Sequence, residues 1–424
     1  MDHFAYHQGR LHCEGVSLDE IARACGTPCY VYSYATFERH FAVFQSALKQ
    51  VAHLICYSVK ANSNGAILRA LGGWGAGADV VSGGELYRVL RAGIPAQRVV
   101  FSGVGKTAAE ISEALEAQIL MFNVESAAEL ELIAAVAKER GCQAPIALRV
   151  NPDVDPRTHP YIATGLKDSK FGIPLEAAWE LYQRALAEPT LLVRGIDCHI
   201  GSQLTELQPV VDALAAVEQM ARRLLARGAP LSYVDIGGGL GVPYEVGQTP
   251  PTPEAYGEAV TGALKELSAL GLTIICEPGR VIAANAGVML VRVLLVKDNG
   301  AKRFVVVDGA MNDLLRPSLY GSHHEIVAVD QRRQAPPAKV DVVGPICESG
   351  DFLAKDRLLP MPQTDDLLAV RTAGAYGFSM ASNYNSRPRL AEVLVRGERF
   401  AVVRAREDYA DLTRGESSPD WLTD

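Results

Sequence analysis

The sequence lacks any apolar run that could cross a bilayer, since no stretch approaches the roughly 20 consecutive apolar residues that a membrane helix needs. The first residues, MDHFAYHQGRLHCEG, have neither the apolar core nor the small-residue cleavage site of a signal peptide. Basic residues are not in excess, because 41 Lys and Arg against 49 Asp and Glu give a formal net charge of −8. A nucleic-acid or anionic-membrane surface needs a basic excess. We therefore expect a protein that binds neither membranes nor nucleic acid.

Cysteine is also used without a pattern. The eight cysteines are dispersed, with no CxxC pair and no regular spacing, and those at 56, 198 and 276 lie inside apolar runs. Disulfide frameworks and zinc sites need paired cysteines at characteristic spacings. The sequence predicts a reduced, cytoplasmic chain with no metal site.

The length of 424 residues exceeds one ordinary domain, so two are expected. Short β-branched runs alternate with helical stretches over the first part of the chain. One helical stretch, 126–140, has Ser126 as a candidate N-cap and Glu129 in position to complete a capping box; another runs from 207 to about 227. The predicted strands are 54–60, 77–82, 98–103, 119–125, 146–151, 193–200, 231–237 and 272–277.

Eight near-continuously hydrophobic strands, each followed by a helix, indicate a parallel sheet buried on both faces. A closed (β/α)8 TIM-like barrel over residues 35–286 fits this count and span better than a doubly wound open sheet. No Rossmann-type glycine turn follows the first strand, which disfavours the open sheet.

Beyond residue 287 the pattern changes to strands separated by turns. The fold class predicted is therefore α/β: a barrel followed by an all-β C-terminal domain that also takes in the N-terminal strand, within GTPCYVYSY. This second domain, a β-sandwich or β-barrel, would comprise 1–34 plus 287–424, with GESSPDWLTD as a loose tail. Its clearest strands are 287–297, 303–308, 338–343, 366–371 and 397–404.

Polar and glycine residues follow the predicted barrel strands, and in such barrels the catalytic groups gather at the carboxyl ends of the strands. Lys60 follows LICYSV, so it would either face inward to pair or form an adduct, or lie in solvent past the strand end. The ring of neighbours favours the first alternative. Its members are Lys60, Asp79, Ser82, Ser102, Asn123, Arg149, Asn151, His199, Ser202, Gly237–Gly239, Glu277, Gly279 and Arg280.

Two loops predict a phosphate site. The run Gly237–Gly239 offers bare backbone amides after one strand, and EPGR (277–280) follows the next strand and opens a helical stretch. His199 could stack on a flat cofactor, although a lone histidine on an apolar strand is more often a satisfied core residue. Glu277 could hold a pyridine nitrogen protonated, or pair with Arg280 instead.

The motifs YSVKAN (57–62), GADVVSGGE (77–85), HIGSQ (199–203), DIGGGLG (235–241) and EPGR (277–280) resemble the fold-type III pyridoxal-phosphate decarboxylases over nearly the whole chain. Four further segments resemble the diaminopimelate decarboxylase branch of that family. They are SKFGI (169–173), MNDLLRPSLYGSHHEI (311–326), GPICESGDFLAKDR (344–357) and AGAYGFSMASNYNSRPR (373–389).

The resemblance implies pyridoxal 5'-phosphate as cofactor and the conversion of meso-2,6-diaminopimelate to L-lysine and CO2. Lys60 would hold the cofactor covalently, His199 would stack on its ring, and Glu277 would contact its nitrogen. Asp79 and Glu85 would support them as polar neighbours. The phosphate would be surrounded by Ser202, Gly239, Gly279, Arg280 and Tyr376.

For the substrate, the resemblance implies that Arg280, Arg316 and Tyr320 hold the distal carboxylate, with Tyr376 nearby. Cys347 and Glu348 would come from the second subunit of a homodimer with shared active sites, Glu348 binding the distal ammonium group. Lys60 or Cys347 would return the proton. The loop from Asn151 to Phe171, with His159 and Lys170, is a candidate lid.

Alternatives stay open at this stage. A related decarboxylase could act on ornithine, arginine or carboxynorspermidine, and an inactive relative could keep the fold as a binding protein. A racemase would need a second base, usually a tyrosine, and a sugar-phosphate aldolase or isomerase shares only the barrel. A substrate panel and the visible absorbance of a bound cofactor distinguish them.

Overall fold

The computed structural model describes residues 2–155, 170–245, 247–332 and 335–422. Its contacts divide the chain into two compact units, Phe37–Ala283 and the pair of segments Met1–Thr36 and Ala284–Asp424. These junctions lie close to the boundaries at 34/35 and 286/287 that we predicted from the change in strand pattern.

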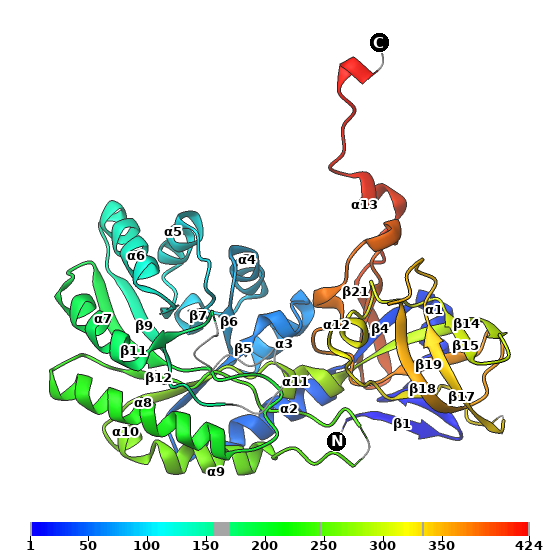
Figure 1. Ribbon diagram of the computed structural model, residues 1–424, viewed down its shortest axis with the longest axis horizontal. Coiled ribbons are helices and arrows are strands. Elements are labelled where there is room, and N and C mark those ends of the chain that lie inside the picture. The colour runs from blue at the N-terminus through cyan, green and yellow to red at the C-terminus, as the bar shows by residue number, and fades with distance from the viewer. Residues whose placement is uncertain (1, 156–169, 246, 333–334, 423–424) are drawn as a thin grey trace. The chain divides into compact units, whose positions relative to one another are not determined.

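The first unit is a closed parallel barrel, which decides between the two predicted sheet types (Figure 1). Eight strands pair in the order β9-β11-β12-β13-β5-β6-β7-β8, and β8 pairs with β9 to close the ring. The strands are β5 (His53–Ser58), β6 (Gly77–Val80), β7 (Val99–Phe101), β8 (Met121–Val124), β9 (Ala144–Asn151), β11 (Leu191–Asp197), β12 (Tyr233–Asp235) and β13 (Thr273–Cys276). β6, β7 and β8 are buried at every residue, as strands covered on both faces must be.

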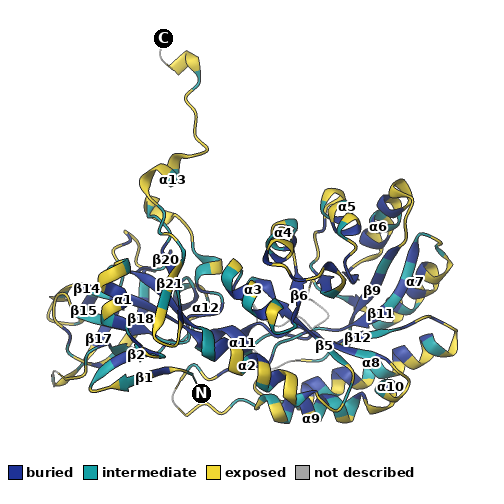
Figure 2. Cartoon of the chain, turned by 180° about the vertical axis from the view of Figure 1, so that it is seen from behind, coloured by how far each residue is buried: buried dark blue, intermediate teal, exposed yellow. Residues whose placement is uncertain are grey.

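Helices follow the barrel strands and cover them. Figure 2 shows α8 with a buried inner and an exposed outer face, the pattern expected of a helix packed on a sheet. The helices are α2 (Tyr34–Ala47), α3 (Gly65–Gly73), α4 (Gly83–Ala92), α5 (Ala108–Ala117), α6 (Ala127–Arg140), α7 (Leu175–Ala187), α8 (Gln208–Ala226), α9 (Pro253–Ala263), α10 (Lys265–Ala269) and α11 (Arg280–Ala283). The short strand β10 (Ile173–Pro174) pairs with the end of β9.

Two local predictions were wrong in detail. Lys60 is not the last residue of the first strand, because β5 ends at Ser58 and a single 3-10 turn, Val59–Ala61, carries the lysine. The capping box at the start of α6 is only half formed. The Ser126 side chain accepts from the Glu129 backbone N–H, but the Glu129 carboxylate accepts from the Glu125 backbone and from Lys106. A buried ammonium group therefore competes successfully for the carboxylate that a capping box needs.

The second unit is rich in β-strands, as predicted, and takes in the N-terminal strands. A seven-strand path runs β18-β17-β15-β14-β4-β20-β21; β19 pairs with β14, β16 pairs with β19, and β1-β2-β3 form a separate sheet. The strands are β1 (Phe4–His7), β2 (Arg10–Cys13), β3 (Val16–Ser17), β4 (Cys29–Ser33), β14 (Gly287–Asp298), β15 (Arg303–Val307), β16 (Ile326–Ala328), β17 (Pro337–Val343), β18 (Phe352–Pro360), β19 (Leu367–Val370), β20 (Ala391–Arg396) and β21 (Arg399–Arg404). The helices are α1 (Leu18–Cys25), α12 (Arg316–Tyr320) and α13 (Tyr409–Thr413).

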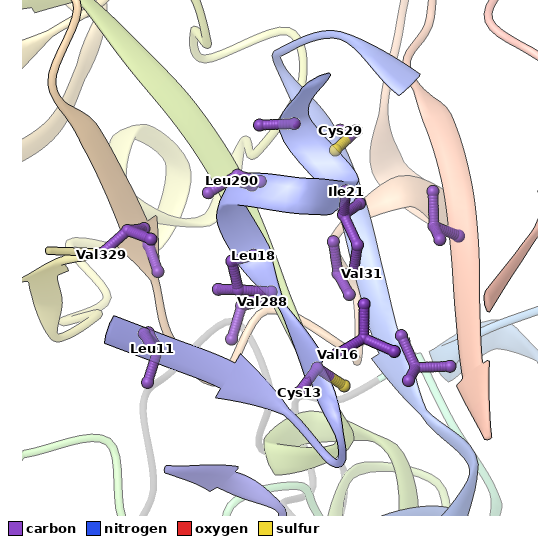
Figure 3. Packing of buried hydrophobic residues seen from close by; sticks show 14 of the residues in the cluster. Leu11, Cys13, Val16, Leu18, Ile21, Cys29, Val31, Val288, Leu290 and Val329 are labelled. Atoms are coloured by element: carbon purple, nitrogen blue, oxygen red, sulfur yellow. The ribbon is translucent and has the colours of Figure 1, made fainter. Parts of the chain in front are cut away.

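The core of this unit explains why the first residues belong to it. Figure 3 shows Leu11, Leu18 and Ile21 from the N-terminal segment packed against Val288 and Leu290 of β14. The cluster also includes residues of β4 and β20, which flank each other in parallel register. Segments more than 260 residues apart in sequence thus share one apolar core, whose burial provides the main favourable free energy for their association.

Among the helices that the structure describes, none has the length and apolar character needed to span a bilayer. The eight cysteines are free thiols, in keeping with their lack of a paired spacing.

Candidate functional site

Lys60 lies at the carboxyl end of β5, beside Asp79 on the neighbouring strand. Its Nζ donates to Asp79 Oδ2 at 2.5 Å, and Ser58 Oγ donates to the same oxygen at 2.8 Å. Burial would raise the pKa of the Asp79 carboxyl, but the charge and hydrogen bond of Lys60 outweigh it and hold that pKa below its ordinary value. The Lys60 side chain is 38% exposed, so its amine is accessible while a buried carboxylate aims it.

His199 follows β11 and is held as a neutral ring. Gly238 N–H donates to His199 Nδ1 at 3.0 Å, so Nδ1 carries a lone pair and the proton lies on Nε2. Burial, together with the charges of Arg149 and Lys60, lowers the pKa of His199 to about 3. Arg149 also donates to the His199 carbonyl at 3.3 Å. The imidazole is thus fixed at the barrel end as a flat, uncharged surface.

The glycine run after β12 is a backbone cradle. A Cβ at Gly239 would overlap the carbonyl oxygen of Gly201, and one at Gly238 would overlap that of Glu277. Gly239 also has a φ of +103°, which side-chain-bearing residues rarely adopt. Gly279 is similarly crowded by the Cβ atoms of Ser58 and Ala61. Glycine is required at these three positions because a neighbouring backbone or Cβ atom occupies the space that a side chain would need.

Arg280 joins two of the predicted phosphate loops. Its Nη2 donates to Ser202 Oγ at 2.9 Å, and its Nη1 donates to the hydroxyl of Tyr244 at 2.7 Å. Arg280 is the first residue of α11 and only 6% exposed. Ser202, Gly239 and Arg280 therefore belong to neighbouring loops, as the phosphate prediction requires, and Tyr244 is a neighbour that the sequence analysis did not identify.

Three buried carboxylates, Asp197, Asp235 and Glu277, meet at the ends of β11, β12 and β13, with one oxygen of each within 4.8 Å of the others. Glu277 accepts from Ser102 and Asn123, each at 3.3 Å, rather than pairing with Arg280 among the described contacts. Burial is the largest cause raising the pKa of all three; repulsion from Asp235 adds to it for Asp197 and Glu277, and repulsion from Asp79 adds to it for Asp235, whose pKa rises to about 6. Such a cluster favours a neighbouring positive charge.

Asp197 and Asp235 were missed by the sequence analysis, although a signal was present. Each is the last residue of its strand: Asp197 lies two residues before the first residue of the recognised motif HIGSQ, and Asp235 begins the recognised motif DIGGGLG, although no role was assigned to either. Because β11, β12 and β13 are neighbours in the barrel, their final residues converge.

These features fit pyridoxal phosphate. The aimed amine of Lys60, the flat neutral ring of His199 and the acidic cluster around Glu277 match an aldehyde, an aromatic ring and a protonated ring nitrogen. The crowded glycine loops with Ser202 and Arg280 match a phosphate.

Glu85 lies beside this site and predicts a pH dependence of stability. Its Oε2 accepts from Val81 N–H at 2.9 Å, yet burial raises its pKa from 4.5 to about 7 against the opposing effects of that bond and Lys60. Between about pH 4.5 and 7 the folded state binds a proton that the unfolded state has released, so stability falls as pH rises. We expect Glu85→Gln to stabilise the cofactor-free protein by about 1–3 kcal/mol at pH 8 and by little at pH 4.5.

Urea unfolding across this pH range measures the effect. Glu116→Gln on the exposed surface of α5, where Glu116 pairs with Arg140, is the control and should leave the pH profile unchanged. Equal effects of Glu85→Gln at pH 4.5 and pH 8 would contradict the prediction.

A second prediction concerns Gly239. Gly239→Ala should weaken pyridoxal phosphate binding by about 10-fold or more and lower the unfolding midpoint, because the new methyl group overlaps Gly201. Gly228→Ala is the matched control, since Gly228 has a φ of +79° but nothing within 4 Å of its added Cβ. It should cost only about 1 kcal/mol of stability and leave cofactor binding unaltered. Titration by absorbance measures binding; equal affinities of the two variants would rule out a role for the cradle.

The remaining predicted site residues lie in the second unit. Arg316 begins α12 and is 5% exposed, and Tyr320 ends that helix, half-buried. Cys347 and Glu348 are exposed; Cys347 N–H donates to Asn385 Oδ1 and Glu348 Oε2 accepts from the Tyr384 hydroxyl at 2.7 Å. The Ser318 hydroxyl donates to the Gly350 carbonyl at 2.6 Å, which ties α12 to the segment carrying Cys347 and Glu348.

Tyr376 lies between β19 and β20 with a φ of +55°, a left-handed conformation that is unusual for a tyrosine. The predicted lid, 151–171, falls mostly outside the described residues, His159 included. At its described ends, Asn151 donates to the Phe171 carbonyl at 3.2 Å, and the Lys170 ammonium lies 5.2 Å from the Phe171 ring centre.

Known proteins resemble the chain over its whole length. Residues 34–284 match the family model described as "Pyridoxal-dependent decarboxylase, pyridoxal binding domain". Diaminopimelate decarboxylase from Pseudomonas aeruginosa is 51% identical over 417 residues, 98% of this chain and 99% of that protein. The corresponding protein of Vibrio cholerae is 50% identical over 418 residues, with coverages of 98% and 99%.

Solved structures of diaminopimelate decarboxylases also resemble the chain. Diaminopimelate decarboxylase from Helicobacter pylori, complexed with L-lysine, is 44% identical with a TM-score of 0.90, covering 94% of this chain and 98% of that one. The enzyme from M. jannaschii, also in complex with L-lysine, is 37% identical with a TM-score of 0.94 and 99% coverage of both chains. The barrel, its polar ring and these similarities lead to one conclusion: the chain belongs to the pyridoxal-dependent decarboxylases and, among them, to the diaminopimelate decarboxylase family.

Proposed function

We propose that this protein decarboxylates meso-2,6-diaminopimelate to L-lysine and CO2, the last step of lysine biosynthesis, with pyridoxal 5'-phosphate as cofactor. The observation that carries the proposal is the amine of Lys60, aimed by buried Asp79 within a ring that also holds His199 and Glu277. The substrate follows from the family, whose similar members are named diaminopimelate decarboxylases at 46–51% identity.

The residues of the barrel hold the cofactor in this proposal. Lys60 would bind it covalently, His199 would present its neutral face to the ring, and Glu277 would contact the ring nitrogen. Ser202, Gly239, Gly279 and Arg280 bind the phosphate, with Tyr376 as a further contact. When bound, the cofactor supplies an electron sink for the negative charge left by departing CO2.

The chain's own groups then handle protons and orientation. Asp79, held in β6, orients the Lys60 amine through their hydrogen bond, since the turn that carries Lys60 directly follows β5, the neighbour of β6. Lys60 or Cys347 returns a proton to the carbon that has lost its carboxyl group. The pKa of His199, near 3, keeps its ring uncharged throughout the working pH range, so the ring packs without repelling a nearby cation.

Substrate selection depends on the distal end of diaminopimelate, which carries a carboxylate and an ammonium group. Arg280, Arg316 and Tyr320 bind the carboxylate, and Glu348 binds the ammonium group. Both arginines are at most 6% exposed, and a buried guanidinium deprived of its carboxylate costs free energy. Substrates without that carboxylate, such as ornithine, are therefore disfavoured.

We also propose a homodimer in which Cys347 and Glu348 enter the site of the second copy. The dimer is supported by the exposure of both residues on their own unit, since the proposed reaction needs them at the substrate. A cytoplasmic location is supported by eight free cysteines, including exposed Cys142 and Cys347.

A substrate panel with purified protein and pyridoxal phosphate tests the function. It contains meso-diaminopimelate, L-lysine, L-ornithine, L-arginine and carboxynorspermidine, with CO2 and product identity as readouts. Lysine formed from meso-diaminopimelate alone is the expected result. Turnover of ornithine or of the carboxypolyamine instead would refute the roles of Arg316 and Glu348, and visible absorbance without any turnover would indicate a binding protein.

A further inference from the structure

Two of the described contacts of the Arg316 guanidinium are with neutral side chains. Its Nη1 lies 3.2 Å from Nε2 of His324, and its Nη2 donates to Ser322 Oγ at 3.3 Å. Arg316 is 5% exposed and His324 is fully buried. A neutral acceptor orients a guanidinium without cancelling its charge, whereas a carboxylate in that place would satisfy it.

The hydrogen-bond pattern determines the tautomer of His324. Its Nδ1 lies 2.9 Å from the carbonyl oxygen of Arg371, which can only accept, so Nδ1 carries the proton. Nε2 is then the lone-pair atom and accepts from Arg316. Burial and the Arg316 charge lower the pKa of His324 to about 3, with smaller effects in the same direction from His323 and Arg357, so the ring remains an acceptor at neutral pH.

The ring is anchored by regular secondary structure. Arg371 N–H donates to the Glu325 carbonyl at 2.8 Å, directly beyond the pairing of Ile326 in β16 with Val370 in β19. On the other side, Gly321 ends α12 in a left-handed conformation and turns the chain back, so that Ser322 reaches the guanidinium. The β16–β19 pairing and the turn after α12 thus each help to fix the orientation of the Arg316 guanidinium.

We propose that His324 is a positioning residue that determines where the Arg316 guanidinium points and so determines how tightly the distal carboxylate of the substrate is bound. The inference rests on the proposed function, which assigns that carboxylate to Arg316. His324 touches neither substrate nor cofactor in this account and acts only through the arginine.

Two substitutions separate the two hydrogen bonds of the ring. In His324→Gln the side-chain oxygen can occupy the place of Nε2 and still accept from Arg316. In His324→Asn the shorter amide can replace only Nδ1, so the bond to Arg371 is retained and the acceptor for Arg316 is lost. Two ligands separate the ends of the substrate: L-lysine, the product, keeps the distal carboxylate, whereas cadaverine is the same diamine without it.

We expect His324→Asn to raise KM for meso-diaminopimelate and the inhibition constant of L-lysine by about 10-fold, with kcat within about 3-fold of wild type. His324→Gln should change either constant by no more than about 3-fold, and the inhibition constant of cadaverine should stay unchanged in both variants. Holoenzyme is used throughout, and the unfolding midpoint and visible absorbance confirm that each variant is folded and loaded. If His324→Asn does not fold, Ser322→Ala, which removes the other acceptor, should raise both constants by about 3-fold.

Equal constants for wild type and His324→Asn, or a similar loss of lysine and cadaverine binding, would overturn the inference. Arg316→Ala distinguishes this failure from that of the proposed function. If Arg316→Ala raises KM for meso-diaminopimelate while His324→Asn does not, only the positioning role is wrong. If Arg316→Ala also leaves KM unchanged, the assignment of Arg316 to the distal carboxylate is itself wrong.

Discussion

Lys60→Ala is expected to lower kcat for meso-diaminopimelate by about 1,000-fold or more. The substitution removes the amine that donates to Asp79 near the carboxyl end of β5. In the proposed function this would abolish both the covalent attachment of the cofactor and a proton donor at the reacting carbon. It also leaves Asp79, which is fully buried, without its cation. CO2 release and visible absorbance of the purified protein measure the two losses separately.

Lys60→Arg is the matched control. It keeps a cation beside Asp79, so the unfolding midpoint should stay near that of wild type, but a guanidinium cannot replace the amine in covalent attachment. Small primary amines added to Lys60→Ala should restore part of the turnover, because they can enter the vacated space and carry the proton. Turnover of Lys60→Arg at more than about a tenth of the wild-type rate would refute the covalent role.

The barrel could be predicted because its strands are buried on both faces and therefore form unbroken apolar runs such as LICYS and ILMFNV. The strands missed in the second unit lack such runs. β18 carries three consecutive charged residues, Lys355, Asp356 and Arg357, with register shifts against β17, and β16 has only three residues. In β20 a buried Glu392 is satisfied by Tyr32 and Arg404, partners that sequence alone cannot identify.

The candidate site also has a part that the sequence identifies and a part that it does not. Residues carried by motifs, such as Lys60 in YSVKAN and His199 in HIGSQ, could be predicted individually. Their partners could not, because those contacts depend on closure of the barrel. Asp197 and Asp235 approach Glu277 only when β11, β12 and β13 lie side by side. Likewise Glu129 leaves its capping box because Lys106, from the preceding β/α unit, reaches it at 2.6 Å.

Arg316→Ala is expected to lower kcat/KM for meso-diaminopimelate by about 100- to 1,000-fold. Any turnover of L-lysine as a substrate should stay the same, because the single carboxylate of lysine is then at the reacting carbon and its distal end has none. The loss for meso-diaminopimelate is expected because a buried guanidinium, 5% exposed and oriented by His324 and Ser322, can form charge-assisted hydrogen bonds to a carboxylate that a methyl group cannot replace. Steady-state kinetics on both substrates give the change in selectivity directly.

Two further arginine variants help to explain the change in kcat/KM caused by Arg316→Ala. Arg316→Lys keeps the charge but not the planar guanidinium group, so its kcat/KM for meso-diaminopimelate should fall between those of wild type and Arg316→Ala. Arg303→Ala removes an exposed arginine of β15 that pairs with Asp298 at 2.9 Å, and it should alter neither substrate's kinetics. If Arg316→Ala lowers kcat/KM equally for diaminopimelate and lysine, the arginine supports the fold or the cofactor. If only diaminopimelate suffers, the free energy that selects the substrate comes from its distal carboxylate.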